Sequence, residues 1–275
     1  MPKGLVLGLV RAIAVIFGVI TLTFVLLHLA PGDPVQRLLG PSATPAQVDA
    51  LRHSVGLDRS IPAQFVGWIG RALTGDFGTS IATGRSVSNS LAQAWPATAA
   101  LVVLSLLLTY FFGLSLGAYQ ANTRSRAADG LVTIGTVTLN AMPGYWLGLV
   151  LVMVFTYHYR LLPAFGASGL DSEFLTPTGK AVDYLRHLAL PLLTLTLIGI
   201  GGIARFSRAS MREVRDAPYL TVARAKGIGP IRTVVRHQFR NALVPIVTLL
   251  GLSLPALFSG TVFVEAVFAC PASVS

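Results

Sequence analysis

Few residues in this 275-residue sequence have the types and spacing that catalysis requires. Its five histidines show no metal-ligand spacing such as H-E-x-x-H, and its single cysteine, Cys270, allows no intramolecular disulfide. The phosphate-binding pattern G-x-x-x-x-G-K-[ST] does not occur. We therefore expect a protein without catalytic residues, without a metal site and without a cofactor of its own.

The most informative stretch is the basic segment 206–240. Small and apolar residues alternate with its charges up to Gly227, and a second apolar set follows Gly229-Pro230 at helical spacing. The pattern predicts two short helices joined by a glycine turn, lying along a membrane with basic residues toward lipid headgroups or a partner. A loop that only fixes membrane topology is the alternative, but such a loop needs charge and no periodicity. The second apolar set consists of Ile231, Val234, Val235 and Phe239.

A second candidate is the run 140–146, where Pro143-Gly144 interrupts an apolar stretch. Non-helical backbone at membrane depth is tolerated only where it is buried or lines a cavity, and broken helices often mark transport pathways. Plain helix packing around a proline kink is an equal alternative. The predicted pathway contacts are Asn140, Met142, Pro143, Tyr145 and Trp146.

Glu265 is a third candidate, because it lies at the end of another apolar stretch. An acidic side chain in such a place is unusual and often functional. It either faces the vestibule of a transport pathway or reaches interfacial water, and the sequence favours neither.

The elements that position these residues are expected to be membrane helices. The sequence is 53% hydrophobic and 12% charged, against about 25% charged residues in soluble domains, and its mean hydropathy is +0.69. Its formal net charge is +10. A nucleic-acid-binding protein could carry that charge but not so much apolar surface, so we expect a lipid bilayer as partner and no nucleic acid.

Five stretches are apolar over roughly the 20 residues that a membrane-spanning helix needs. They are 12–30, 97–119, 131–157, 188–204 and 242–263. Thirteen of the 21 Lys and Arg residues fall on one side of these spans with only three acidic residues, whereas the other side is balanced. The positive-inside bias therefore predicts a cytoplasmic N-terminus and a cytoplasmic segment 206–240.

The first outer loop, 31–95, is expected to be a small ordered α-rich domain. Thr44 and Pro45 resemble a helix start, and a second amphipathic piece at 64–73 ends at the turn signal Gly75-Asp76. Four side chains in this loop need burial, which weighs against a floppy linker. They are Phe65, Trp68, Ile69 and Phe77.

Several motifs, in order from residue 1 to about 268, resemble those of membrane permease subunits of ABC importers. More narrowly, they resemble the first permease subunit of oligopeptide, dipeptide and nickel importers. The motifs are Pro31-Gly32-Asp33-Pro34-Val35, Gly75-Asp76-Phe77-Gly78, Pro143-Gly144-Tyr145-Trp146, Leu190-Pro191-Leu192, Ala223-Arg224-Ala225-Lys226-Gly227, Arg236-His237-Gln238-Phe239-Arg240-Asn241 and Val262-Phe263-Val264-Glu265.

The resemblance implies an all-α, polytopic bundle in a bacterial inner membrane. It implies that a coupling helix, the family's EAA loop, docks in a groove of a cytoplasmic ATPase. Thr221 stands where the wider family has Glu, and Phe239-Arg240-Asn241 replaces its apolar-Pro ending, as in the peptide branch. The residues assigned to coupling are Tyr219, Leu220, Thr221, Ala223, Arg224, Ala225, Lys226 and Gly227.

The implied partners are a second homologous permease, two ATPase subunits that bind ATP and Mg, and an extracytoplasmic binding protein. The expected activity is peptide import driven by ATP hydrolysis in those partners, with nickel or another small solute as an alternative substrate. A non-transporting membrane anchor or assembly protein is a remoter alternative. We expect a first helix in 1–30, an external domain in 31–95, permease helices in 96–268 and an atypical tail in 269–275, in place of the sixth helix of the family.

Overall fold

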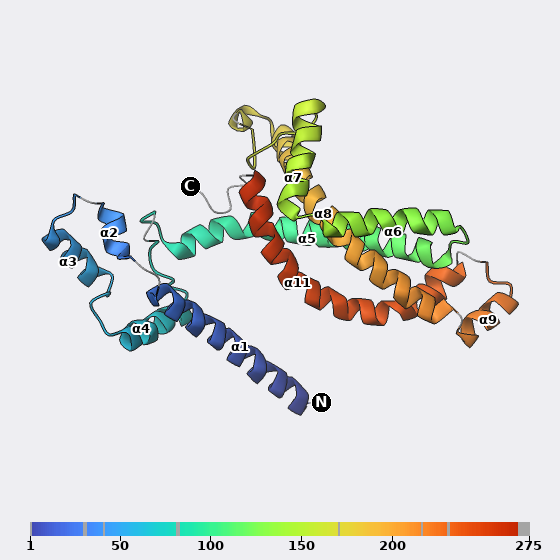
Figure 1. The fold of residues 1–275 in the computed structure, drawn as a ribbon, viewed down its shortest axis with the longest axis horizontal. Coiled ribbons are helices and arrows are strands. Elements are labelled where there is room, and N and C mark those ends of the chain that lie inside the picture. Colours follow the sequence, from blue (N-terminus) through green and yellow to red (C-terminus); the bar gives the residue numbers. More distant parts are fainter. Residues whose placement is uncertain are drawn as a thin grey trace. The chain divides into compact units, whose positions relative to one another are not determined.

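The computed structural model describes residues 2–29, 32–40, 42–80, 83–169, 171–215, 217–229 and 232–268 (Figure 1). Within these ranges the regular structure is helical, apart from one isolated antiparallel bridge between Thr79 and Ser86. The all-α fold class expected from the sequence is thereby confirmed. The predicted tail, 269–275, lies outside the described residues.

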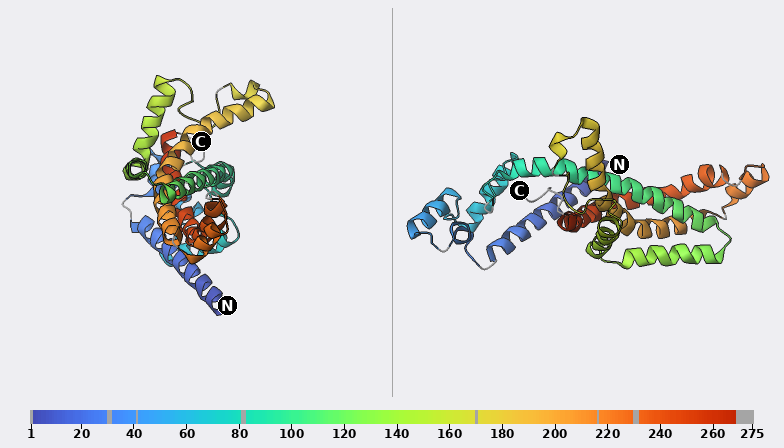
Figure 2. Two further views of the ribbon diagram at one scale, coloured as in Figure 1. Left: turned by 90° about the vertical axis from the view of Figure 1, so that its right-hand side faces the viewer. Right: turned by 90° about the horizontal axis from the view of Figure 1, so that it is seen from above.

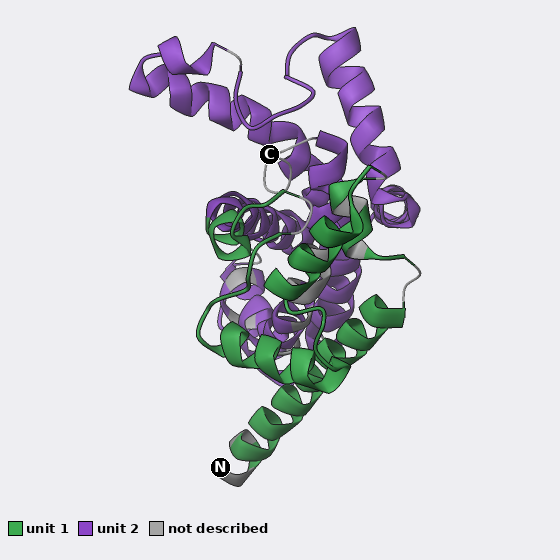
Figure 3. Ribbon diagram, turned by 90° about the vertical axis from the view of Figure 1, so that its left-hand side faces the viewer, with its two compact units in different colours: residues 1–92 green, residues 93–275 purple. Residues whose placement is uncertain are grey.

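The chain divides into two compact units, residues 1–92 and 93–275 (Figure 3). Unit 1 contains the first apolar helix together with the segment expected to be external, and unit 2 contains the remaining apolar helices. Each unit is described by itself below.

Unit 1 holds four helices: α1 (Pro2–Leu29), α2 (Pro34–Leu39), α3 (Pro45–Ser54) and α4 (Ile61–Leu73). Helix α3 begins where the sequence predicts, because Thr44 and Gln47 cap it reciprocally. The Thr44 hydroxyl accepts the Gln47 backbone N–H at 3.4 Å, and the Gln47 side chain accepts the Thr44 backbone N–H at 3.0 Å. This capping box satisfies two backbone donors that the first turn leaves free.

The packing of unit 1 is looser than predicted. Phe65 of α4 contacts Phe17 and Phe24 of α1, with ring centroids 6.0 and 5.0 Å apart. However, Trp68 and Ile69 are only half-buried and Phe77 is exposed, so the expectation that these side chains are buried is wrong in degree. The short helices α2 and α3 pack on each other and α4 contacts α1, an arrangement that encloses little, and Val35 is the only buried hydrophobic residue among those described in this unit.

Unit 2 contains the long helices (Figure 2). They are α5 (Val87–Asn122, which starts in unit 1), α6 (Arg126–Ala141), α7 (Gly144–Val152) with the π-helix η1 (Met153–His158), the 3-10 turn η2 (Ser172–Phe174), α8 (Pro177–Arg215), α9 (Pro218–Ala225), the π-helix η3 (Thr233–Phe239) and α11 (Arg240–Phe268). Helix α8 is central, because α6, α7 and α11 all pack against it.

Three helices, α1, α5 and α8, are each long and apolar enough to cross a membrane. The third predicted span, 131–157, is not one straight helix: α6 and the α7–η1 segment meet at 104° across Met142 and Pro143. A proline lacks the N–H that would continue the helix, and it disfavours helical backbone in the residue before it. The interruption was predicted, but the size of the bend was not.

Helix α8 also differs from the prediction. The sequence indicated a span at 188–204 followed by a loop from 206, whereas the helix runs without a break to Arg215. Three basic residues of this extension contact neighbouring elements. Arg208 and Arg212 contact Asp129 near the start of α6, and Arg215 donates to the carbonyl of Ala121 at 3.1 Å.

Small residues bring these helices close together. A Cβ on Gly117 of α5 would lie 2.5 Å from the Ser207 Cβ and 2.6 Å from the carbonyl oxygen of Ala204. A Cβ on Gly201 of α8 would lie 2.3 Å from the carbonyl oxygen of Thr136 in α6. Glycine is therefore required at both positions, and helix association in membranes commonly uses such contacts.

Candidate functional site

Helix α9 contains most of the residues assigned to coupling, and it is two-faced. Leu220 is fully buried and Ala223 is nearly so, whereas Tyr219 and Val222 are 41% and 53% exposed. Thr221, Ala225 and Lys226 are exposed as well, and the side chain of Arg224 lies outside what the structure describes. One face of α9 is thus anchored on the bundle, and the other presents an aromatic and an aliphatic side chain.

The turn after α9 forms at the glycine that the sequence indicated. Gly227 has φ +75°, a conformation that favours glycine, and Ile228 donates back to the carbonyl of Ala223 at 3.2 Å. The second predicted short helix is different, because it is the π-helix η3, which continues directly into α11. The predicted helix–turn–helix loop is therefore one short helix followed by the beginning of the last long helix.

The π-helix η3, against which α9 packs, is fixed to α8 by Gln238. Its side-chain amide donates to the carbonyl of Met211 in α8 at 2.8 Å, and both residues are fully buried. Met211 packs with Ala121 and Ala242, which joins α5, α8 and α11 at this end. Helix η3, which lies next to α9, is thus joined to the end of the bundle where these three helices meet.

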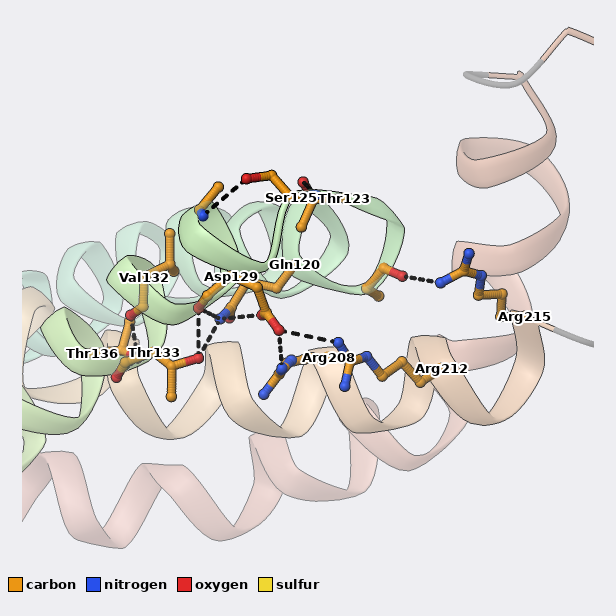
Figure 4. Close-up of polar contacts among 12 residues, drawn as sticks. Gln120, Thr123, Ser125, Asp129, Val132, Thr133, Thr136, Arg208, Arg212 and Arg215 are labelled. Carbon is orange, nitrogen blue, oxygen red and sulfur yellow. Dashed lines mark hydrogen bonds and ion pairs between the residues drawn. The ribbon is translucent and has the colours of Figure 1, made fainter.

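A polar network that the sequence argument missed lies at the same end of unit 2 (Figure 4). Asp129 accepts hydrogen bonds from Arg208 and, at 3.2 Å, from Arg212 on the next turn of α8. Gln120 of α5 donates to the Asp129 carboxylate at 3.1 Å and to the Thr133 hydroxyl at 2.9 Å. The spacing of the two arginines, four residues apart, could have suggested a shared acidic partner, but the partner's position in space was not readable.

The broken helix brings Asn140 against α8. The Asn140 side chain donates to the carbonyl of Ile198 at 3.4 Å and accepts from Arg205 at 2.7 Å. Asn140 also lines a cavity of about 240 Å³ between α5, α6, α8 and α11, which includes the hydroxyls of Tyr110 and Ser253, 3.1 Å apart. From Gly199, which borders this cavity, to Arg215 at its end, helix α8 rises about 24 Å.

The other residues predicted at the break do not line that cavity. Met142 packs against the apolar cluster of α7, α8 and α11, while Pro143 is exposed. Tyr145 and Trp146 are 54% and 46% exposed on the surface of the chain. The structure thus places Asn140, although exposed, in contact with α8, and it leaves the two aromatic residues on the surface without lining that cavity.

Glu265, the last predicted pathway residue, is half-buried and accepts a hydrogen bond from Thr98 of α5 at 2.7 Å. This bond joins α5 to α11 at the end of unit 2 opposite α9. Glu265 is therefore held by the bundle rather than free in a vestibule, and its role in a pathway stays a prediction.

These features define a helical membrane bundle of the transport class. They are the long apolar helices, the sharply broken helix that packs on the central helix α8, and the short helix α9 with one buried and one exposed face. The chain belongs to the family of binding-protein-dependent transport system inner membrane components. Residues 113–274 match that family, and residues 1–102 match the family of N-terminal regions of these membrane components. It is accordingly a multi-pass inner-membrane ABC permease, and such permeases are transport proteins rather than enzymes.

Individual relatives agree over most of the chain. It is 38% identical to a probable D,D-dipeptide transport system permease protein of Escherichia coli K12, over 96% of this chain and 81% of the relative. It is 34% identical to a di/tripeptide transport system permease protein of Pseudomonas aeruginosa UCBPP-PA14, over 93% of this chain and 80% of the relative. It is 32% identical to an oligopeptide transport system permease protein of Bacillus subtilis 168, over 94% and 81%.

Proposed function

We propose that this chain forms half of the membrane pathway of a peptide importer and that α9 couples the pathway to ATP hydrolysis in partner subunits. The N-terminus and α9 face the cytoplasm, following the charge bias between the two sides. The transported class is short peptides, since the relatives described above carry dipeptide, tripeptide and oligopeptide names.

The observation that carries the coupling role is the division of α9 into a buried and an exposed face. Leu220 fastens the helix to the bundle, and Tyr219 and Val222 remain available to a groove on an ATPase. Aromatic residues are enriched among the side chains that dominate binding energy at protein interfaces. Exposed cations near α9, such as Lys226, affect the rate of association more than its strength.

In this proposal, ATP binding brings two ATPase subunits together and pushes the α9 helices of two homologous permeases. The push reaches α8 and α11 through the Gln238–Met211 contact, and the bundle changes the side on which the pathway is open. An external binding protein delivers the peptide. Because α6–α7 packs on α8, movement of α8 also moves the break at Pro143.

The test is reconstitution in proteoliposomes with the second permease, the two ATPases and the binding protein. We expect peptide-stimulated ATP hydrolysis and peptide uptake, both reduced at least about tenfold by the double substitution Tyr219→Ala/Val222→Ala. Leu131→Ala is the control, because Leu131 is an apolar residue on α6, away from α9, and is even more exposed than Tyr219 and Val222. Gly227→Pro abolishes coupling through the turn. Unchanged activity in both α9 variants would refute the coupling role.

A further inference from the structure

Unit 2 has a second cavity, of about 390 Å³, that the proposed function does not use. It lies where η1 and the chain that follows it meet α8, at the end of the unit opposite α9 (Figure 1). Helix α7 and η1 lead to it directly from the break, over about 18 Å. Its lining includes Thr156, Arg160, Asp183, Arg186 and His187.

The cavity gathers positive charge that has no partner. Arg160 and Arg186 both line it, and neither forms an ion pair with any residue that the structure describes. The hydroxyl oxygen of Thr156, which also lines the cavity, is buried without a hydrogen-bond partner among the residues that the structure describes. Guanidinium groups are permanently charged and match the geometry of a carboxylate, so the unused groups favour an oxyanion.

Arg160 also has a strained backbone. Its φ is +53°, and it is the only non-glycine residue with positive φ in the described part of the chain. Glycine would adopt this conformation without strain, and strained residues cluster at sites where a side chain acts on a ligand. The arginine at this position therefore suggests a function for its side chain rather than for the fold.

An acidic group lies in the same cavity. Asp183 precedes Arg186 by one turn of α8, so the two share a helix face. One oxygen of the Asp183 carboxylate accepts the backbone N–H of Gly169 at 2.7 Å, and the other lies 3.4 Å from Nδ1 of His187. The cavity thus offers both signs of charge, and an extended dipeptide, whose ends are about 7 Å apart, carries both.

We propose that this cavity receives the charged ends of a short zwitterionic peptide. Arg160 and Arg186 bind its carboxylate together with the Thr156 hydroxyl, and Asp183 attracts its ammonium group. The inference rests on the proposed function, in which this end faces the outside and peptides are the cargo. An anionic phospholipid such as phosphatidylglycerol would satisfy the arginines but would bring no ammonium group to Asp183.

The test uses the assembled transporter in phosphatidylcholine nanodiscs without ATP or binding protein. Saturation-transfer difference NMR compares the probes Ala-Phe, Ala-Phe amide and N-acetyl-Ala-Phe. We expect the free dipeptide to bind about fivefold or more tightly than either blocked form, as for partly exposed charge-assisted bonds. The double substitution Arg160→Gln/Arg186→Gln reduces the affinity for the free dipeptide to the affinity that the wild type has for the amide. Lys180→Gln, which removes a charge from the same helix outside the cavity, leaves binding unchanged.

The variant Arg160→Gly distinguishes a role of Arg160 in ligand binding from a role in the stability of the fold. It relieves the positive φ, so the variant is at least as heat-stable as the wild type, yet it loses the preference for the free carboxylate. Equal binding of all three probes, or equal loss in Lys180→Gln, overturns the proposal. The proposal is also overturned if Arg160→Gln/Arg186→Gln copurifies with less phosphatidylglycerol than the wild type but binds the dipeptide equally well, because the cavity would then be a lipid site. If the wild-type transporter takes up no peptide at all, the proposed function itself fails.

Discussion

The ion pair between Asp129 and Arg208 is expected to hold the α5–α6 turn onto α8. Asp129 and Arg208 are 19% and 24% exposed, whereas Arg212, which contacts the same carboxylate, is 49% exposed. Removing one partner of a fully buried pair costs about 3–5 kcal/mol, and an exposed pair contributes about 0–1 kcal/mol. The solvent that reaches this pair reduces the expected cost of Asp129→Asn to about 2 kcal/mol.

Two double-mutant cycles, both on the Asp129 carboxylate, measure the contributions of Arg208 and Arg212 separately. The first combines Asp129→Asn with Arg208→Gln, and the second combines it with Arg212→Gln, with reversible unfolding of the purified protein in mixed micelles as the assay. We expect a coupling energy of about 1–2 kcal/mol for Arg208 and less than about 0.5 kcal/mol for Arg212. High salt should weaken the second coupling more than the first, because exposed charges are screened more strongly.

Equal coupling energies for the two arginines would refute this reasoning, since burial would then not decide the strength of the contact. A coupling energy near zero for Arg208 would refute it as well, and would indicate that the basic extension of α8 is held only by apolar packing through residues such as Met211. Arg126→Gln serves as a control, because this exposed cation is near Asp129 in sequence but forms no ion pair with any described residue.

Three further perturbations follow from the structure. Gly117→Ala should cost about 1–3 kcal/mol of stability in the same unfolding assay, because the new Cβ would lie 2.6 Å from a backbone oxygen. Gly130→Ala should be neutral or stabilising, because a Cβ at Gly130 has no atom within 4 Å. Leu220→Ala should cost about 2–5 kcal/mol and Val222→Ala less than about 0.5 kcal/mol, and the reverse order would contradict the orientation of α9. The pKa of Asp33 is lowered mainly by the hydrogen bond from the Val35 N–H and also by Arg52. The contribution of Asp33 to stability is therefore complete above the ordinary pKa of an aspartate and is lost as the pH falls through the lowered pKa. An NMR titration of the Val35 amide measures this loss, and Asp33→Asn should remove the pH dependence.

Local features of this protein were predictable where a short sequence determines them. The capping box at Thr44, the interruption at Pro143 and the positive-φ turn at Gly227 each follow from the chemistry of one or two residues. The class of the fold was predictable for the same reason, since long apolar runs allow few structures in a bilayer.

Features that depend on contacts between distant residues were not predictable. The 104° bend is set by how α6 and α7 each pack on α8, and the sequence gives no register for that packing. The extension of α8 to Arg215 contacts Asp129, which lies 79 residues from Arg208 in sequence. The partial burial of Trp68 likewise depends on how the helices of unit 1 pack, which its local sequence does not specify.

Helix α8 links the two ends at which we propose function. Its first turns carry Asp183 and Arg186 of the outer cavity, its last turns adjoin α9, and its 39 residues extend over about 58 Å. Between them, Gly201 and Asn140 hold the broken helix against it. Coupling between distant sites requires an element with two discrete arrangements that both sites bias. We propose that the break at Pro143 is where such an element changes its arrangement, since Pro143 is exposed whereas the close contacts on α8 leave no room for a shift.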